Sequence, residues 1–414
     1  MSPTHRSLRH TRQPLTASTI TPWWHGRALD VVDGNLTFAG ASVATLVREH
    51  GTPLYAYDGT EIRRRVASLR DVLERHGLTP RIYYAMKANR FATVLAVFRA
   101  DGHVGIDASS PREVEFARSA GFSPAEISVT ASCLSARDLE YFATSGVHVN
   151  LDTISAIVRY AECEPRLKQI GIRIDTGIEV GYGVNAKTAY AGGKLGLAPE
   201  EFDAAVQAAT EGGLIVDTLH THLGWGLRAS DEGDVARAFA CIADLARRVP
   251  ALREINVGGG LGGRLVEADA PLDPETWAAV VARAFASLNV RIACEPGTYL
   301  VAEAGVLIVE VASVWDKQGV HWAGVDASFA TNVYAAHYAL PLEIIPAQRS
   351  LADRDRAYSI AGNINESGDV FARDLALPVL TAGEHLVFFP AGAYGSSMSS
   401  DHCLRGNFTE VLVR

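Results

Sequence analysis

The chain of 414 residues is 48% hydrophobic and 21% charged, so it can bury a large barrel core and still supply a second domain. Its formal net charge of −9 argues against general binding to nucleic acids or membrane surfaces, because both need a positive field. No apolar run reaches the roughly 18 residues that span a bilayer. We therefore expect a globular protein with small-molecule partners, no nucleic acid and no membrane.

The first 29 residues contain four arginines and no acidic residue, a composition that can mimic an organelle transit segment. We interpret residues 1–20 as a flexible basic tail, and no continuous apolar stretch predicts a secretion signal. The five cysteines are widely spaced and odd in number, which predicts neither a disulfide framework nor a CxxC metal site. This cysteine usage is typical of a reducing compartment, so we expect a cytoplasmic protein.

The first expected strands form a hairpin at residues 29–38, which turns at Asp33 and Gly34. An Asp-Gly pair favours the tight turns that connect two antiparallel strands. The hairpin belongs to an N-terminal segment, residues 21–53, which we expect to join a β domain although it precedes the barrel in sequence.

Residues 54–300 show short apolar runs that alternate with amphipathic helical segments, the pattern of repeated βα units. Eight such runs occur at residues 82–86, 104–107, 127–131, 147–151, 170–174, 218–222, 255–257 and 290–293. Helical patterns occur at residues 111–120, 136–145, 200–211, 234–248 and 274–288. Eight strands with crossover helices over about 250 residues predict a (β/α)8 barrel.

After residue 300 the pattern changes to strand-like runs separated by Gly, Pro and Asn, with almost no helical periodicity. The runs occur at residues 306–315, 322–325, 357–361, 385–389 and 408–413. Residues 301–414 are therefore expected to form a C-terminal all-β domain, a small barrel or sandwich.

Polar residues that close the barrel strands are the candidates for chemistry, because such barrels place their active sites at the carboxyl ends of the strands. These residues are Lys87, Asp107, Arg173, Asp175, His220, His222 and Glu295. Lys87 follows an apolar strand, where burial or a covalent partner should make its amine neutral. That is the chemistry of a Schiff-base lysine, although a solvated lysine at a strand end would fit the same pattern.

Three consecutive glycines, Gly258, Gly259 and Gly260, directly follow the seventh expected strand. Glycine lets backbone N–H groups approach and hold a phosphate, whereas a tight structural loop is the alternative interpretation. The phosphate site of these barrels often follows strands seven and eight, so the position of the loop favours phosphate.

His220 and His222 are separated by one residue of the sixth expected strand. We expect them to point to opposite faces, one stacked on an aromatic ligand and the other hydrogen-bonded in the core. A zinc site would need a nearby cysteine or a third histidine, and this segment has neither.

Together these motifs resemble the fold-type III pyridoxal-phosphate decarboxylases, which include the ornithine and arginine decarboxylases, and most of all the diaminopimelate decarboxylases. The matching segments, in order, are YAMKAN (84–89), HTHLG (220–224), GGG (258–260), CEPG (294–297), ESGD (366–369) and AGAYG (391–395). The resemblance implies an alanine-racemase-like plan, with a cofactor-binding barrel and a C-terminal β domain. It also implies a homodimer whose active sites lie at the subunit interface.

The resemblance implies that Lys87 binds pyridoxal phosphate as a Schiff base, that His222 stacks on its ring, and that Glu295 pairs with its pyridine nitrogen. A carboxylate there keeps the nitrogen protonated, which makes the ring an electron sink. The residues expected to bind the cofactor are Lys87, Asp107, Arg173, His222, Gly258, Gly259, Gly260, Glu295, Gly297 and Tyr394.

Three positions depart from the pattern of diaminopimelate decarboxylases. Thr298 and Tyr334 stand where that family has arginines near the substrate, and Asn365 replaces the cysteine proposed as a proton donor. Because arginine is the preferred partner of a carboxylate, these changes should weaken selection for a distal carboxylate unless Arg349 or Arg405 compensates.

Glu366, expected from the second subunit, can still pair with a distal amine. The expected substrate-binding residues are Thr298, Tyr334, Tyr338, Glu366, Asp369 and Tyr394, and the expected catalytic residues are Lys87, His222, Glu295, Asn365 and Glu366.

These observations predict a pyridoxal-phosphate-dependent amino-acid decarboxylase whose substrate has a distal amine. A diaminopimelate decarboxylase of lysine biosynthesis, with a rearranged carboxylate site, is the closest alternative. An amino-acid racemase shares the domain plan, but that family places arginine at the pyridine nitrogen. An inactive binding homologue is the fourth hypothesis, against which Lys87 and the intact glycine loop argue.

Overall fold

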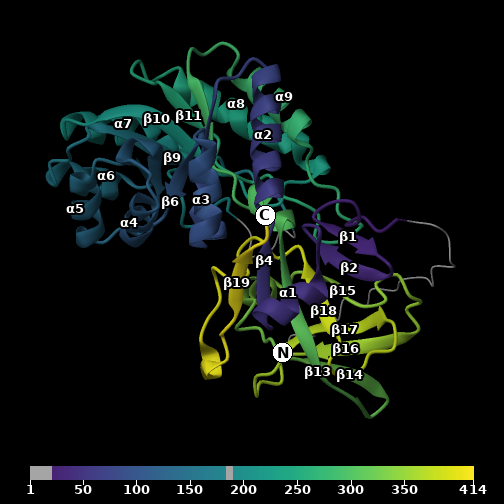
Figure 1. Ribbon diagram of the computed structural model, residues 1–414. Coiled ribbons are helices and arrows are strands. Elements are labelled where there is room, and N and C mark those ends of the chain that lie inside the picture. The colour runs from purple at the N-terminus through teal and green to yellow at the C-terminus, as the bar shows by residue number, and fades with distance from the viewer. Residues whose placement is uncertain (1–20, 183–189) are drawn as a thin grey trace, which may run out of the picture.

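The computed structural model describes residues 21–182 and 190–414, and the tail expected at residues 1–20 lies outside the described residues. An α/β barrel forms the upper part of the molecule in Figure 1, and a β domain lies below it. This architecture confirms the barrel and the separate β domain predicted from the sequence. None of the described helices is both long enough and apolar enough to cross a membrane.

Eight parallel strands close the barrel in the order β10-β11-β12-β5-β6-β7-β8-β9. They are β5 (Pro80–Ala85), β6 (Val104–Ala108), β7 (Ile127–Thr130), β8 (His148–Leu151), β9 (Gln169–Ile174), β10 (Ile215–Thr221), β11 (Glu254–Asn256) and β12 (Arg291–Cys294). The surrounding helices are α2 (Gly59–Arg75), α3 (Ala92–Asp101), α4 (Pro111–Ser119), α5 (Ala136–Ser145), α6 (Ile154–Glu162), α7 (Phe202–Glu211), α8 (Glu232–Ala246) and α9 (Pro274–Phe285). Every expected barrel strand is therefore present, within a few residues of its predicted bounds.

Capping residues explain where several barrel helices begin. Asp58 accepts hydrogen bonds from the backbone of Thr60 and Glu61 at the start of α2. Ser110 caps α4 and Asp273 caps α9, and each is followed by a proline in the first turn. Such caps satisfy N–H groups that have no partner within the helix, and proline there loses no hydrogen bond.

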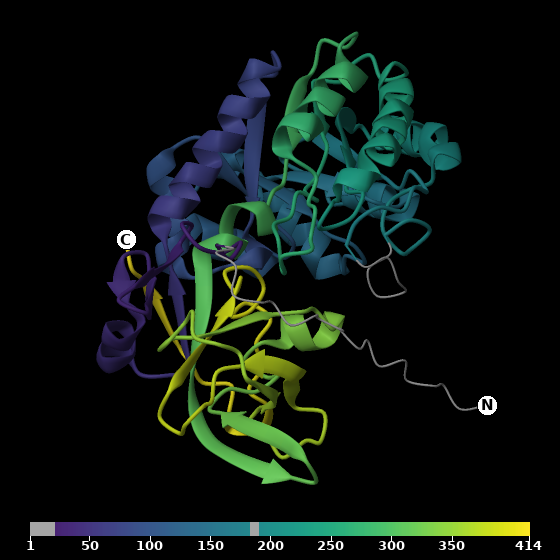
Figure 2. The ribbon, with the colours of Figure 1, turned by 90° about the vertical axis from the view of Figure 1, so that its right-hand side faces the viewer.

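The β domain is organised around the long strand β13 (Gly305–Lys317), which pairs with strands on both sides. Its other strands are β4 (Leu54–Tyr57), β14 (Val320–Val325), β15 (Glu343–Pro346), β16 (Arg356–Ala361), β17 (Val370–Leu377), β18 (His385–Phe389) and β19 (Thr409–Leu412). The sequence patterns did not predict β15, β17 or the short helix α11 (Val333–Tyr338). Figure 2 shows α11, in light green, on the side of the β domain that faces the barrel.

The boundary expected at residue 54 places β4 in the barrel, but β4 belongs to the sheet of the β domain. It pairs with β13 in the antiparallel sense and with β19 in the parallel sense. All four of its residues are buried, so β4 behaves as a central strand of that sheet. The barrel therefore begins after β4, with helix α2.

The N-terminal segment contains the expected hairpin, β1 (Leu29–Val32) and β2 (Asn35–Phe38), followed by β3 (Ala41–Ser42) and α1 (Val43–His50). Asp33 and Gly34 have positive φ angles of 50° and 76°, as this tight turn requires. The three strands form a sheet of their own. Leu36 and Phe38 nevertheless share a buried cluster with Val306, so the segment joins the β domain by packing.

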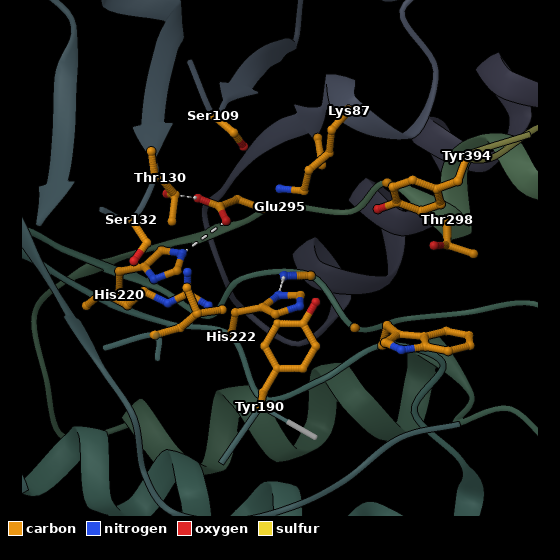
Figure 3. A pocket seen from close by; sticks show the side chains of 18 of the residues that line it. Lys87, Ser109, Thr130, Ser132, Tyr190, His220, His222, Glu295, Thr298 and Tyr394 are labelled. Carbon is orange, nitrogen blue, oxygen red and sulfur yellow. Dashed lines mark hydrogen bonds and ion pairs between the residues drawn. The ribbon is translucent and has the colours of Figure 1, made fainter. Parts of the chain in front are cut away.

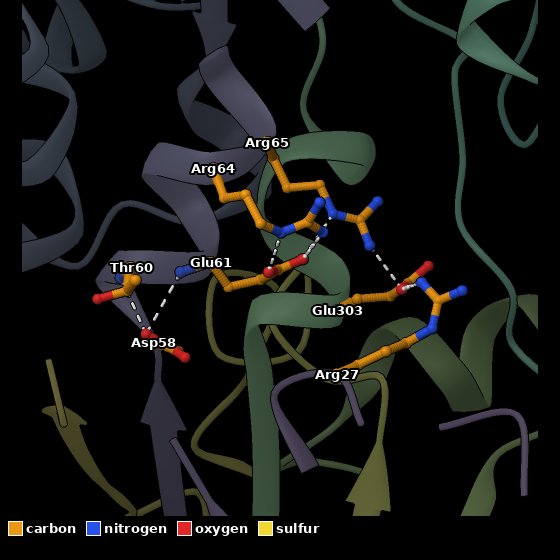
Figure 4. Close-up of polar contacts among 7 residues, drawn as sticks. All are labelled: Arg27, Asp58, Thr60, Glu61, Arg64, Arg65 and Glu303. Carbon is orange, nitrogen blue, oxygen red and sulfur yellow. Dashed lines mark hydrogen bonds and ion pairs between the residues drawn. The ribbon is translucent and has the colours of Figure 1, made fainter. Parts of the chain in front are cut away.

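A buried ionic network joins the barrel to the N-terminal segment and to the connection that leads into β13 (Figure 4). Glu303, which is 5% exposed, accepts hydrogen bonds of 2.6 Å from both Arg27 and Arg65. Arg65 also donates to Glu61 of its own helix, α2. Removal of one member would leave a buried charge without its partner, so we expect this junction to be sensitive to substitution.

Candidate active site

A cavity of about 400 Å³ lies at the carboxyl ends of the barrel strands, where the β domain meets the barrel. The barrel contributes Lys87, His222 and Glu295 to its lining, and the β domain contributes Tyr334 and Tyr394. Figure 3 shows the amine of Lys87 directed into the space between Glu295 and Tyr394. Strand ends of the barrel therefore form one side of the cavity, and aromatic residues of the β domain form another.

Lys87 lies two residues beyond β5, and its side chain is 45% exposed. Its Nζ is 2.9 Å from Oδ2 of Asp107, which is completely buried at the end of β6. Burial of the amine lowers the pKa of Lys87, but the Asp107 carboxylate outweighs this effect and raises the pKa above its ordinary value. Burial alone therefore does not neutralise the amine, because Asp107 favours the ammonium, and the expected covalent partner stays a prediction.

Glu295 lies directly after β12, and both of its oxygens accept hydrogen bonds. Oε2 is 3.0 Å from Nε2 of His220, and Oε1 is 2.7 Å from the Asn256 amide and 3.1 Å from the Thr130 hydroxyl. Burial raises the pKa of Glu295, but His220 and the Lys87 ammonium more than offset this and bring the pKa below its usual range. Glu295 is therefore a buried, ionised carboxylate held in place by three hydrogen-bond partners.

His220 and His222 do not point to opposite faces of their strand, and that prediction is wrong. Residues two apart on a strand share a face, and both imidazoles line the cavity. His220 is fully buried against Glu295, as expected for the hydrogen-bonded core histidine.

Nδ1 of His222 accepts a hydrogen bond of 3.0 Å from the backbone N–H of Gly259. Burial and the nearby Arg173 guanidinium lower the pKa of His222 to about 3, so its ring is neutral at pH 7. The ring of Tyr190 meets His222 edge-on, with centroids 5.0 Å apart. A neutral ring held on two sides is suited to stack on a planar ligand.

The glycine loop is shaped by its packing as well as by its backbone angles. A side chain at Gly259 would place Cβ 2.6 Å from the carbonyl oxygen of Glu295, and Gly260 has a φ of 107°. Both positions therefore require glycine. Within the described residues, the N–H groups of Gly260 and Leu261 donate to no protein acceptor, and both residues line the cavity. Such free donors can hold a phosphate.

Arg173, Gly297, Thr298 and Tyr394 also line the cavity, as expected. Burial raises the pKa of Tyr394 to about 12, although Lys87 and a hydrogen bond with Thr298 oppose this shift. The phenol is therefore neutral and able to donate a hydrogen bond near the glycine loop. These groups fit pyridoxal phosphate. The amine matches its aldehyde, and the buried carboxylate matches its pyridine nitrogen. The neutral imidazole matches its ring, and the free backbone donors match its phosphate.

Five predicted site residues do not line this cavity: Asp107, Gly258, Asn365, Glu366 and Asp369. Asn365 and Glu366 are exposed on the β domain, where Oε1 of Glu366 is 3.5 Å from Nε2 of His402. Asp369 is buried and accepts hydrogen bonds from the backbone of Phe329 and Ile364. Its carboxylate is thus occupied within its own domain, whereas that of Glu366 is accessible. Neither Arg349 nor Arg405 lines the cavity of its own chain.

Several residues that line the cavity were not identified from the sequence patterns, among them Tyr190, Lys194, Trp225 and Met398. Tyr190 and Lys194 lie between β9 and α7, away from any expected strand end. Trp225 directly follows the HTHLG segment, and that proximity was the one available signal.

Comparison with known proteins agrees with this geometry. Residues 60–302 match the family described as pyridoxal-dependent decarboxylase, pyridoxal binding domain. The chain is 33% identical over 393 residues to a diaminopimelate decarboxylase of Methanothermobacter thermautotrophicus, with 92% of this chain and 91% of that protein covered. It is 31% identical to a diaminopimelate decarboxylase of Streptomyces coelicolor, with 90% and 87% covered.

Among solved structures, the Helicobacter pylori diaminopimelate decarboxylase complexed with L-lysine is similar, with a TM-score of 0.81 and 26% sequence identity. The similarity covers 90% of this chain and 94% of that one. The relatives therefore share both domains of the chain, the barrel and the β domain.

Proposed function

This chain belongs to the pyridoxal-dependent decarboxylase family, and from that membership we propose that it decarboxylates an amino acid with a distal amine and no distal carboxylate. It is a carboxy-lyase that uses pyridoxal phosphate. The observation that carries the finer proposal is the wall of the cavity beside Lys87. Thr298 and Tyr334 line this wall at the two positions where the resemblance places arginines.

When bound, pyridoxal phosphate supplies an electron sink for the charge that remains on Cα as CO2 departs. In our proposal Lys87 binds the cofactor covalently, and Asp107 orients the amine through their 2.9 Å contact. His222 stacks on the ring, and the free N–H groups of the glycine loop hold the phosphate. Glu295, kept ionised by its neighbours, holds a proton on the pyridine nitrogen.

The proposed substrate preference follows from desolvation. A distal carboxylate that is buried without an arginine loses its hydration and gains no charged partner on this wall. A distal ammonium can instead be paired by a carboxylate, and Glu366 is the candidate from a second subunit. Glu366 is 54% exposed and lies outside the cavity of its own chain, which supports a role across an interface.

Subunit mixing would test this arrangement. We expect Lys87→Ala and Glu366→Ala homodimers each to have low activity, and mixed dimers to regain activity because one of their two sites is intact. Measurement of the molar mass in solution would establish the dimer first. A monomeric active enzyme, or mixed dimers with no gain in activity, would contradict this part of the proposal.

Decarboxylation of meso-diaminopimelate is the second candidate function, and two observations favour it. Arg173 and Lys194 line the cavity and can donate hydrogen bonds to a carboxylate. The relatives reported above are diaminopimelate decarboxylases. In this alternative, side chains of the barrel replace the missing arginines in space.

A CO2-release screen separates the two functions. The substrates are meso-diaminopimelate, both enantiomers of lysine and of ornithine, arginine, and diamino acids of shorter chain, each with the holoenzyme. We expect the highest kcat/KM for a substrate that lacks a distal carboxylate. Efficient turnover of meso-diaminopimelate, with all others at background, would refute the preference and leave the family assignment intact.

A further inference from the structure

Three aromatic rings meet at one corner of the cavity, contributed by both domains. Trp225 comes from the barrel, in the segment after β10, and Tyr334 and Tyr338 lie one turn apart on α11 of the β domain. The Trp225 centroid is 6.1 Å from that of Tyr334 and 5.9 Å from that of Tyr338, and the two tyrosine rings are 5.5 Å apart. Their planes are inclined to one another by 58° to 68°. We call these three residues the aromatic corner.

The aromatic corner is uncharged and supported from behind. Burial raises the pKa of Tyr334 and of Tyr338, so both phenols stay neutral at physiological pH. Buried Leu265, Ala335 and Leu340 pack against its rings. The corner is therefore an uncharged aromatic part of the cavity wall, and it cannot pair with a ligand through an ionised side chain.

The described residues of this chain that line the rest of the cavity offer no free carboxylate to a cationic ligand. Among the described residues that line it, Glu295 is the one acid, and His220, Asn256 and Thr130 already engage its oxygens. The remaining charged lining residues are Lys87, Arg173 and Lys194, which are all basic. Within this chain, the ring faces are thus the groups best able to stabilise a distal cation.

The aromatic corner is also connected to the reacting end of the cavity. Tyr394, which lies beside Lys87, has its ring centroid 4.9 Å from that of Tyr334. The corner therefore begins one ring away from the lysine.

We infer that the aromatic corner of Trp225, Tyr334 and Tyr338 binds the distal ammonium of the substrate through cation–π contacts. The inference rests on the proposed preference for a distal amine, and it assigns part of that preference to this chain's own rings. A distal carboxylate at the same place would face the negative side of the ring quadrupoles, so the corner disfavours diacids as well.

The test compares two amines that differ at the distal group. In 1,5-diaminopentane an ammonium occupies the end of the chain, and in hexylamine a methyl group replaces it. Calorimetry with the holoenzyme gives the ratio of their dissociation constants. We expect Trp225→Leu and Tyr338→Leu each to reduce the preference for the diamine by about three- to tenfold.

Trp225→Phe and Tyr338→Phe keep a ring at each position and should retain most of the preference. Trp315→Leu is the matched control, because Trp315 lies on β13 and does not line the cavity. This control variant should give the wild-type ratio, and so show that the effect requires loss of a ring at the corner.

The inference would be overturned if both leucine variants kept the wild-type ratio of dissociation constants. It would also be overturned if Glu366→Gln lost the preference for the diamine while the leucine variants kept it. The result is separate from the substrate screen. If the wild-type enzyme decarboxylated only meso-diaminopimelate, the proposed preference would fail, but the amine ratios would still decide whether the aromatic corner binds an ammonium.

Discussion

The two sides of the cavity differ in charge and in structural origin. The barrel side is ionic, and each of its acids has a partner: Asp107 contacts Lys87, and Glu295 contacts His220. The aromatic corner is neutral, and it combines a barrel segment with α11 of the β domain. In our proposal, the groups for the reaction lie at strand ends, whereas the groups for selectivity lie on a loop and a short helix. With this separation, substitutions on the loop and the helix could change the substrate preference while the reaction is retained.

The largest effect is expected from the loss of the lysine. Lys87→Ala should lower decarboxylation by at least about 10³-fold, because no other amine can replace the covalent attachment in the same geometry. Borohydride reduction of the wild-type enzyme, followed by peptide mass analysis, should place the pyridoxyl group on Lys87. Lys194→Ala is the control, since Lys194 also lines the cavity. An adduct on Lys194 would reverse the assignment.

The next effect concerns the buried carboxylate. Glu295→Gln should retain the cofactor and lose about 10²- to 10³-fold in the rate of CO2 release, because the amide removes a fixed negative charge. Cofactor content and single-turnover kinetics would separate binding from chemistry. Unchanged turnover under conditions where chemistry is limiting would count against this role.

Glu303→Gln is a matched control for Glu295→Gln. Glu303 is also a buried carboxylate, but it lies at the domain junction in contact with Arg27 and Arg65. We expect this substitution to destabilise the fold by about 3–5 kcal/mol, because it removes a charged partner of the buried Arg65, and to change kcat little. Equal losses of activity in the two variants would argue that Glu295 also acts through the fold.

A smaller effect should follow from arginines placed on the aromatic side. The double variant Thr298→Arg with Tyr334→Arg should increase kcat/KM for meso-diaminopimelate, relative to the preferred substrate, by about tenfold. Thr298→Gln with Tyr334→Leu is the uncharged control, which should show no such gain. A gain of equal size in both double variants would mean that the size of the cavity, not its charge, sets the preference.

The smallest effect is expected at Asn365, which is exposed on the β domain. An amide is a very poor acid, so Asn365→Cys should increase the rate of Cα protonation by a few-fold if this position faces the site of a second subunit. Solvent-deuterium incorporation and the stereochemistry of the product would reveal the change. If rate, stereochemistry and deuterium content all stayed the same, Tyr334, Cys403, His402 or an ordered water would be the better candidate donor.

The sequence by itself predicted the barrel, because short apolar runs and helical periods are local patterns that each βα unit repeats. It also predicted that Lys87, Asp107, Glu295 and the glycine loop lie at one end of the barrel. In a parallel barrel the last residues of every strand lie at the same end. Strand β17 was missed because four of its eight residues are only partly buried and three are exposed, so it lacks an apolar run.

The tertiary structure alone decided the contacts between distant segments. Asp107 stabilises the charge of Lys87 although they are 20 residues apart, and β4 joins a sheet whose other strands follow the barrel in sequence. Trp225 and Tyr338 meet although more than 100 residues separate them. No local pattern encodes such pairings, because they depend on how the barrel and the β domain pack against each other.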